Sequence, residues 1–314
     1  MGEPTFSAVV PAFNAEATLD HTVRSVLAQT EQDFELLIVD DGSSDGTLEL
    51  ARSFETDPRV GVIHQANKGL AGARNTGIAA AAGRYVAFLD SDDLWMPDFL
   101  RATGGALDAD PGAAFAYTDG WALDDESGRL LRATVMARQR PPVPPPREAP
   151  EFLDQLVRRN FILAEATVRK SALDDVGPFV ESLPAVEDYE LWLRLLAHGY
   201  RALRPPGLLL IRRDHPRSMS KDSVLMDTAT RRVLEIVIES HPAPEPVKAV
   251  ARRRIAEIDR LLAAATQEGV HRPLPVRARG WAGSVKRALL GDRLYLPEPP
   301  PEVARAFPEL AAKR

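Results

Sequence analysis

Five short apolar runs alternate with helical patterns between residue 6 and about residue 118 of this chain. They are FSAVVPAF (6–13), FELLIVDD (34–41), VGVIHQ (60–65), YVAFLD (85–90) and AAFAYTD (113–119). Short runs that are apolar throughout suit strands covered on both faces, as in a parallel sheet. Between the first two runs, Leu19, Val23, Val26 and Leu27 recur at the spacing of an amphipathic helix. This alternation predicts an α/β fold with an open, mostly parallel sheet flanked by helices. Its ligand crevice is expected at the carboxyl ends of the strands.

Carboxylates gather at two of these strand ends. Asp40 and Asp41 close the second run, and Asp90, Asp92 and Asp93 follow the fourth. Like charges this close repel one another, and the end of a buried apolar run is a costly place to gather them. Two readings stay open from the residues alone. Either the acids hold a divalent cation, Mg²⁺ or Mn²⁺, which prefers hard oxygen ligands, or they form a solvated turn that caps the next helix.

Other motifs fail on spacing. DGSSDG (41–46) begins like a calcium loop, but its twelfth position is Arg52 where a bidentate Glu is needed. A phosphatase with an aspartyl nucleophile would place its Asp pair after the first strand, with Thr or Val where Leu94 stands. GLAGARNTG (69–77) has the spacing of neither a dinucleotide fingerprint nor a phosphate-binding loop.

A proline-rich break, RQRPPVPPPREAP (138–150), interrupts the pattern and is expected to be a mobile loop. Pro97 is expected in the first turn of a helix. The later elements expected are a helix near 151–159, a strand near 166–170, a helix over 187–199 that stops at Gly199, a strand over 201–212, and helices after 222 with proline-marked joints near 242–246 and 273–275. We therefore expect an α/β domain over 1–222 and a helical region over 223–314.

Charge and composition limit the partners and the location. Residues 223–314 hold 16 Lys and Arg against 11 Asp and Glu, whereas the whole chain has a net charge of −6. Residues 1–222 are therefore acidic, which argues against nucleic acid as the main partner. The chain has no Cys, no run of about 18 apolar residues and no signal-peptide pattern at its start. These features predict a cytoplasmic location.

Five motifs, taken together and in this order, resemble the family 2 glycosyltransferases. They are VVPAFNAEATL (9–19), IVDDGSSDGT (38–47), NKGLAGARNTGI (67–78), FLDSDD (88–93) and EDYELWLRL (187–195). The resemblance covers roughly residues 6–220. It implies the GT-A fold, a nucleotide-sugar donor and inversion at the anomeric carbon. Two rival functions are kept beside it, a nucleotidyltransferase of related fold and an inactive sugar-nucleotide-binding protein. The absence of Gly from VVPAFNAEATL argues against the former.

The resemblance implies a set of donor-binding residues. Phe13 would stack on the nucleotide base, and Asp41 would accept a hydrogen bond from the N3–H of uracil, which favours a UDP-sugar. Asp40 would support that loop or the ribose, and Arg74 would lie near the base and phosphates. The other residues implied on the donor side are Pro11, Ala12, Asn67, Lys68, Asn75, Asp90, Ser91 and Asp92. Taken alone, Phe13 reads equally well as a core residue and Asp41 as a turn residue.

The resemblance also implies a metal and a base. Asp92 and Asp93 would hold Mn²⁺ or Mg²⁺ with the donor diphosphate, and His215 would reach the metal or the diphosphate. Asp188, preceded by Glu187, would be the base that takes the acceptor proton. Without the other motifs, both acids read as complements to the dipole of the helix that they begin. Arg212, Arg213 and Lys221 would neutralise phosphate or form a basic surface loop.

The acceptor side is less constrained. No Gln-x-x-Arg-Trp follows Trp192, so we expect an enzyme that adds one sugar per encounter to a sugar, a glycolipid or another small molecule. In the basic stretch 272–293, Trp281, Val285 and Leu289 lie on one predicted helical face. That face would contact an anionic membrane at the inner side of the cell envelope, or pack on the catalytic domain or a second subunit in a homodimer.

Overall fold

The computed structural model describes residues 2–139, 149–216, 218–267, 296, 298–308 and 310. The predicted joint near 273–275 and the basic stretch 272–293 lie outside these residues, as does the centre of the proline-rich break. Both ends of that break are helical, because α5 spans Val135–Gln139 and α6 spans Ala149–Arg158. No helix among the described residues is long and apolar enough to cross a membrane.

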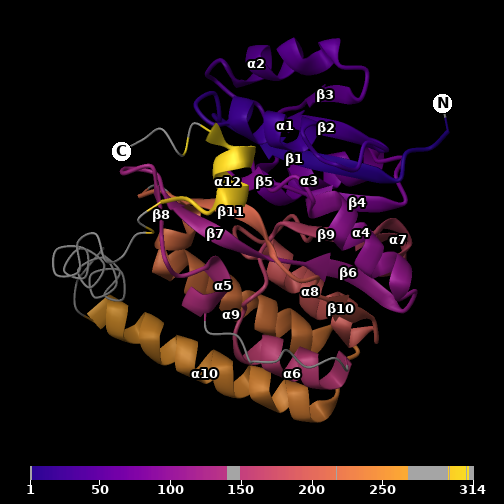
Figure 1. Cartoon of the computed structure of the whole chain (residues 1–314). Helices are drawn as coiled ribbons and strands as arrows, with labels where there is room; N and C mark the ends of the chain where they lie inside the picture. The colour runs from indigo at the N-terminus through magenta and orange to yellow at the C-terminus, as the bar shows by residue number, and fades with distance from the viewer. Residues whose placement is uncertain are drawn as a thin grey trace.

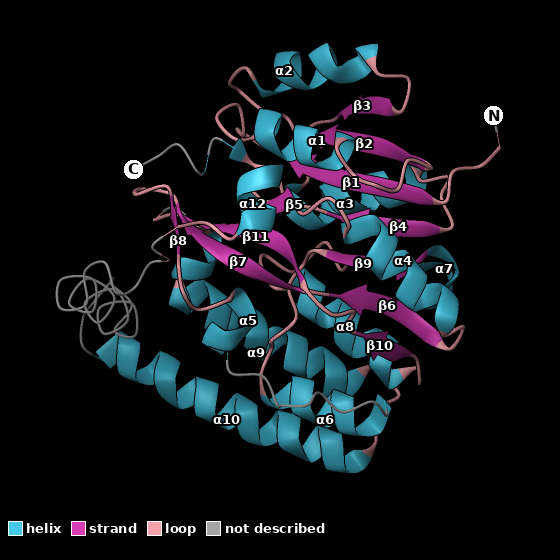
Figure 2. Ribbon diagram, viewed as in Figure 1, coloured by secondary structure: helices cyan, strands magenta, loops and turns pink. Residues whose placement is uncertain are grey.

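A seven-stranded sheet in the order β10-β6-β9-β4-β1-β2-β3 forms the centre of the molecule (Figures 1 and 2). Its strands are β1 Phe6–Ala12, β2 Phe34–Asp40, β3 Val60–His64, β4 Tyr85–Phe88, β6 Ala113–Tyr117, β9 Ala166–Arg169 and β10 Arg201–Leu203. Every neighbouring pair in this described sheet is parallel except the two pairs that β9 makes, with β4 and β6. The five apolar runs are thus strands of a mostly parallel sheet, as predicted, and β9 confirms the strand predicted near 166–170.

The register of the sheet brings the acidic strand ends together. β1 lies between β2 and β4, with Ala12 opposite Asp40 and Val9 opposite Phe88. The backbone N–H of Asp41 continues this pairing by donating to Ala12 O at 2.8 Å. The residues that follow β2 and those that follow β4 therefore emerge at the same edge of the sheet, where parallel α/β folds bind their ligands.

Helices cover both faces of the sheet (Figure 2). Besides α5 and α6, the described helices are α1 Leu19–Leu27, α2 Thr47–Ser53, α3 Gly69–Ala80, α4 Phe99–Ala109, α7 Lys170–Val176, α8 Glu187–Ala197, α9 Ser223–Glu239, α10 Glu245–Gln267 and α12 Pro301–Ala306, with short 3₁₀ turns at Phe54–Thr56 and Met219–Lys221. Alternate residues of β1 serve the two cores, because Val9 packs on the side of α3 and α8 whereas Ala8 and Val10 pack on the side of α1 and α4. Helix α3 lies so close to β1 that a Cβ at Gly77 would stand 2.3 Å from Val9 Cγ1.

Two predicted boundaries are wrong in detail. The single strand predicted over 201–212 is two strands, β10 and β11 Leu208–Asp214, which belong to different sheets. Pro205 and Pro206 interrupt backbone pairing there, and Gly207 turns the chain at φ +106°. Pro97 lies outside the helix that it was expected to begin, because α4 starts at Phe99 after the capping position Asp98.

A second, four-stranded sheet in the order β5-β11-β7-β8 lies beside the first. Its other strands are β5 Leu94–Trp95, β7 Asp119–Asp124 and β8 Arg129–Leu130. On this sheet, Val303 and Phe307 of the C-terminal segment pack against Leu94 and Ile211. Figure 1 shows α12 close to β5 and β11, far from α10. The C-terminal segment thus reaches the part of the molecule that carries the acidic residues after β4.

The helical region after residue 222 shares a core with the part of the chain that precedes it. Helix α9 begins at Ser223, where the second region was predicted to start. Its residues Val233 and Leu234, with Val250 of α10, belong to the same hydrophobic cluster as Leu195 of α8. Figure 1 shows α10 running along α9 and α6. The division at residues 222 and 223 stays a prediction about domains, although the packing is continuous across it.

Candidate active site

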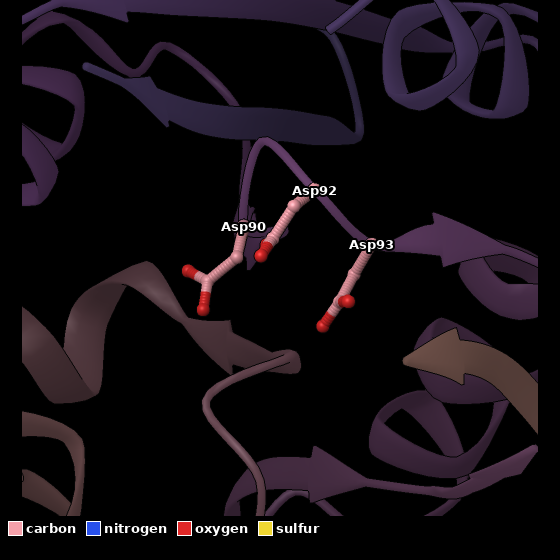
Figure 3. A group of neighbouring side chains, drawn as sticks. All are labelled: Asp90, Asp92 and Asp93. Carbon is pink, nitrogen blue, oxygen red and sulfur yellow. The ribbon is translucent and has the colours of Figure 1, made fainter. Parts of the chain in front are cut away.

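Asp90, Asp92 and Asp93 lie together in the turn between β4 and β5, here called the acid loop (residues 90–93). One side-chain oxygen from each of the three lies within 4.8 Å of the others. Figure 3 shows the three carboxyl groups on the same side of the turn. The strand end predicted from the sequence thus gathers three oxygen ligands in one place, with Ser91 between them.

Burial and repulsion act on these carboxyl groups. Asp93 is only 2% exposed, and its burial, followed by the charges of Asp92 and Glu165, raises its pKa well above the usual range. Burial and then the charge of Asp90 raise the pKa of Asp92. Raised pKa values mean that the ionised cluster is costly as it stands. A cation bound among the oxygens would remove that cost.

Strand β11 supplies positive and hydrogen-bonding groups to the acid loop, because β5 and β11 pair directly. The backbone N–H of Arg213 donates to Asp93 Oδ1 at 2.8 Å. His215 Nε2 lies 3.1 Å from Asp92 Oδ2, so the predicted His does reach the cluster. Burial acts to lower the pKa of Arg212, but the surrounding carboxylates raise it above its usual value. Arg212 is therefore a buried cation that counters part of the charge of the cluster.

The other two predicted cations are engaged elsewhere. The Arg213 guanidinium pairs with Asp125 at 3.1 Å. Lys221 pairs with Asp214. Among these residues, the structure therefore supports a charge-neutralising role most directly for Arg212.

Glu165 is a fourth acid at this place, and it was not among the site residues predicted from the sequence. It is 2% exposed, and burial followed by the charge of Asp90 raises its pKa. Glu165 precedes β9, the antiparallel strand next to β4, and this topology brings it to the acid loop. A local signal was present, because Glu165 is the lone charge in the stretch NFILAEATV (160–168), where an unpaired carboxylate would be expensive.

Arg74 links the two groups of acids that the sequence places 97 positions apart, at residues 90 and 187. It is 1% exposed, and its terminal nitrogens pair with Asp90 and Glu187. Its guanidinium also lies over the ring of Phe179, 5.5 Å from the centroid. Arg74 thus ties the acid loop to the first turn of α8. Its predicted contact with the donor stays a prediction, since both terminal nitrogens are already bound.

Asp188 lies at the start of α8, beside this bridge. Val186, just before the helix, is held at φ +54°, an unfavourable conformation for a β-branched residue. Asp188 Oδ1 accepts a hydrogen bond from the backbone N–H of Tyr189 at 2.7 Å. Burial and then the charge of Glu187 raise the pKa of Asp188 to about 7, although Arg74 acts to lower it. A carboxylate with this pKa can take up and release a proton near neutral pH.

The predicted base-binding residues line the adjacent strand ends. The Phe13 side chain is 52% exposed, so it is not a core residue and its ring is free to stack. Asp41 Oδ1 accepts hydrogen bonds from Gln65 Nε2 at 2.7 Å and from the backbone N–H of Lys68 at 2.9 Å. Asp40 is fully buried, with Oδ2 2.7 Å from His64 Nδ1. Asp41 is therefore held in a fixed orientation, and support of the loop or the ribose by Asp40 stays a prediction.

The remaining donor-side candidates differ in solvent exposure and in hydrogen bonding. Pro11 and Ala12 are buried in β1, next to Phe13, and Asn67 and Lys68 are exposed. The Asn75 side chain both donates to Phe179 O at 3.0 Å and accepts from Phe179 N at 2.9 Å. It therefore fixes the segment that carries the ring beneath Arg74. A contact between Asn75 and a donor stays a prediction.

Comparison with known proteins gives a family match. The family model described as Glycosyl transferase family 2 matches residues 7–176. A putative teichuronic acid biosynthesis glycosyltransferase of Bacillus subtilis, TuaG, is 34% identical over 205 residues, which are 64% of this chain and 75% of that protein. Several other curated relatives are matched over only 16% to 26% of their own length.

Two solved structures resemble the fold. Residues 1–349 of Staphylococcus aureus TarS superpose with a TM-score of 0.61 at 19% identity, over 92% of this chain and 82% of that one. The mannosyltransferase PcManGT of Pyrobaculum calidifontis, solved with GDP-Man and Mn²⁺, has a TM-score of 0.59 at 20% identity, over 91% of this chain and 81% of that one. At this identity the likeness shows the fold alone, which is the GT-A fold.

Proposed function

This chain belongs to glycosyltransferase family 2, and we propose that it transfers one sugar at a time from a nucleotide-sugar donor to an acceptor hydroxyl, with a divalent metal and with inversion at the anomeric carbon. A UDP-sugar is the expected donor. Membership of this family rules out the nucleotidyltransferase that was kept as a rival. The inactive binding protein stays a rival, which the experiment below addresses.

The observation that carries the proposal is the bridge through Arg74. Inverting transfer needs a leaving diphosphate and a base on opposite sides of one sugar. The acid loop and Asp188 would serve these two ends, and Arg74 pairs with Asp90 of the first and Glu187 of the second. One side chain thus spans the distance between them. Two acidic groups on different faces of the protein would not support this chemistry.

The chemistry of the acid loop suits a divalent cation. It offers three carboxylates with oxygens within 4.8 Å of one another, and His215 is next to Asp92. Oxygen ligands of this kind favour Mg²⁺ or Mn²⁺, and an imidazole nitrogen is tolerated by Mn²⁺. We assign metal contact to Asp92, Asp93 and His215. When bound, the metal supplies positive charge to the donor diphosphate as that group leaves.

Asp188 is the proposed base. Its Oδ1 is bound to the Tyr189 N–H, so Oδ2 is left to take the proton of the acceptor hydroxyl. The acceptor oxygen then bonds to the anomeric carbon as the bond from that carbon to the diphosphate oxygen breaks. The proton ends on Asp188 and the nucleoside diphosphate departs. A pKa of about 7 lets Asp188 lose this proton again before the next cycle.

The donor base is assigned from the exposed Phe13 ring and the oriented Asp41 carboxylate. TarS, one of the structural neighbours, has been solved with UDP, and PcManGT with GDP-Man. Both kinds of donor therefore occur on this fold, and the preference for uracil rests on Asp41. For the acceptor we propose a growing sugar chain or glycolipid, since the relative TuaG is named for teichuronic acid biosynthesis.

The proposal is tested by release of nucleoside diphosphate. The full chain is incubated with a panel of UDP-sugars and GDP-mannose, with Mn²⁺ and with EDTA. We expect UDP release that depends on Mn²⁺ and on one sugar of the panel. A protein that binds UDP-sugars but never turns them over would be the inactive binder. Binding of nucleoside triphosphates in place of any sugar nucleotide would contradict the proposal.

A further inference from the structure

Helix α1 carries a buried polar stripe that the proposed function does not use. Thr22, Ser25 and Gln29 are 0%, 3% and 1% exposed. Their spacing of three and four residues places them on one side of the helix and its C-terminal turn. Buried side chains of this kind are costly unless each finds a hydrogen-bond partner. The identity of those partners is informative.

All three side chains bind the backbone of the chain segment that contains the acid loop. Thr22 Oγ1 lies 3.0 Å from Ser91 O and 2.9 Å from Asp93 O, while its helical acceptor Thr18 O is at 3.5 Å. The single hydroxyl hydrogen is therefore shared between the two loop carbonyls. These carbonyls belong to the peptide group before Asp92 and to the one after Asp93, so one hydroxyl holds the backbone on both sides of two proposed metal ligands.

Ser25 and Gln29 continue the same contact. Ser25 Oγ donates to Thr22 O at 2.7 Å and accepts from the backbone N–H of Trp95 at 3.1 Å. Gln29 Nε2 donates to Met96 O at 2.9 Å, and Gln29 Oε1 accepts from the backbone N–H of Leu100 at 3.0 Å. These side chains thus serve as partners for the backbone N–H groups of Trp95 and Leu100, while Met96 O also accepts from the Phe99 N–H at 3.0 Å.

Two backbone carbonyls of the acid loop are bound to α1, and the carboxyl side chains of the loop point in a different direction from these carbonyls. Figure 3 shows the three carboxyl groups together on one side of the turn. A carboxylate cluster with this much self-repulsion would spread apart unless its backbone were held. The bonds from α1 supply such a hold without adding any charge.

We propose that Thr22, supported by Ser25 and Gln29, is a positioning residue that fixes the acid loop in the conformation that binds the metal and the donor diphosphate. The proposal rests on the assigned metal role of the acid loop. A residue that only stabilised the fold would lower global stability when altered, with no particular effect on the acid loop. For Thr22 we expect that loss of the hydroxyl loosens the acid loop in particular.

The test uses three variants of the full chain. Thr22→Val keeps the shape of the side chain and removes its hydroxyl, and Thr22→Ser keeps the hydroxyl. Thr103→Val is the matched control, because Thr103 is also a fully buried helical Thr, with bonds to Phe99 O at 2.8 Å and Thr167 Oγ1 at 2.8 Å and none to the acid loop. Two quantities are measured: hydrogen–deuterium exchange of residues 90–96 without metal, and Mn²⁺ binding in the presence of UDP by electron paramagnetic resonance.

We expect Thr22→Val to speed exchange at the Asp93 amide, which donates to Asp90 O within the turn, and to weaken Mn²⁺ binding by about tenfold. Thr22→Ser should behave like the unchanged chain, and Thr103→Val should lose thermal stability without either effect. Equal exchange and equal Mn²⁺ binding in Thr22→Val and Thr103→Val would overturn the proposal.

Two further outcomes remain decisive. If Thr22→Val does not fold, Ser25→Ala makes the same test, since it removes the acceptor of the Trp95 N–H. If the unchanged chain binds no Mn²⁺ with UDP, the metal part of the proposed function fails. The exchange of residues 90–96 then still decides whether α1 holds the acid loop.

Discussion

The two acidic regions of the site, the acid loop and the start of α8, both consist mainly of carboxylic acids, but the charges around those acids differ. In the acid loop, burial and neighbouring carboxylates raise the pKa of Asp92 and Asp93, with His215 and Arg212 acting against them. At α8, burial and Glu187 raise the pKa of Asp188 to about 7, and Arg74 limits the rise. The first region needs a further cation before all its groups can ionise together. The second already contains its cation and is left with one carboxyl that titrates near neutral pH.

The difference would allow one kind of side chain to serve the two proposed functions, metal binding and proton transfer. Three acids whose oxygens converge favour a bound ion, because each added charge raises the cost for the others. Asp188, beside the Arg74–Glu187 pair, has a pKa of about 7 and can exchange a proton near neutral pH. Arg74 pairs with an acid of each region. Substitutions in the acid loop and at the start of α8 can therefore be compared to separate the proposed metal role from the proposed base role.

The largest expected effect comes from a matched pair of amide substitutions. Asp188→Asn removes the proposed base and should lower the transfer rate by about 10² to 10⁴-fold while leaving UDP affinity unchanged. Asp93→Asn should weaken Mn²⁺-dependent UDP binding as well as the rate. Initial rates of UDP release and calorimetric UDP binding, with and without Mn²⁺, give the two quantities. Unchanged transfer by Asp188→Asn would assign the base to another residue.

A smaller effect is expected when the bridge is weakened. Arg74→Lys keeps the charge but cannot pair with Asp90 and Glu187 together in the planar fork geometry. We expect the transfer rate to fall by roughly 10 to 100-fold with intact folding. Arg169→Lys is the control, because Arg169 also bridges buried groups, with bonds to Ala113 O and Leu107 O, yet touches neither acidic region. Equal losses in both variants would mean that the bridge matters only for folding.

The smallest effect is on stability and follows from the raised pKa of Asp188. A carboxyl whose pKa is about 7 in the folded chain and 3.8 when unfolded favours folding below pH 3.8, and loses that contribution as the pH rises through about 7. At pH 8, Asp188→Asn should therefore increase the free energy of unfolding, by about 1 to 3 kcal/mol. At pH 5 the gain should be smaller. Urea unfolding at the two pH values measures both, and an equal gain at each would place the Asp188 pKa near its ordinary value.

The sequence predicted the parts of the site that follow strands directly. Asp41 follows β2 and the acid loop follows β4, and both strands belong to the regular alternation of strands and helices. That alternation was enough to predict that the two lie at one edge of the sheet. Asp188 was proposed as the base from the family resemblance, because the helix pattern alone would read it as a complement to the helix dipole. These signals are local, and the family resemblance connected them.

The parts that sequence reasoning missed depend on contacts between distant segments. Glu165 joins the acid loop only because β9 inserts antiparallel next to β4. Residues 201–212 were read as one strand because apolar periodicity does not reveal that Pro205 and Gly207 divide them between two sheets. Arg74 was expected to face the donor, and its pairing with two acids 16 and 113 residues away left no trace in the local pattern.

The central claim is that the acid loop and Asp188 act on the same donor sugar. A crystal of the full chain with Mn²⁺ and a non-hydrolysable UDP-sugar tests this directly through the anomalous signal of the metal. We predict Mn²⁺ at coordination distance from Asp92 and Asp93. The anomeric carbon of the sugar should carry the diphosphate on one side and be open toward Asp188 on the other. A metal bound elsewhere, or a sugar turned away from α8, would contradict it.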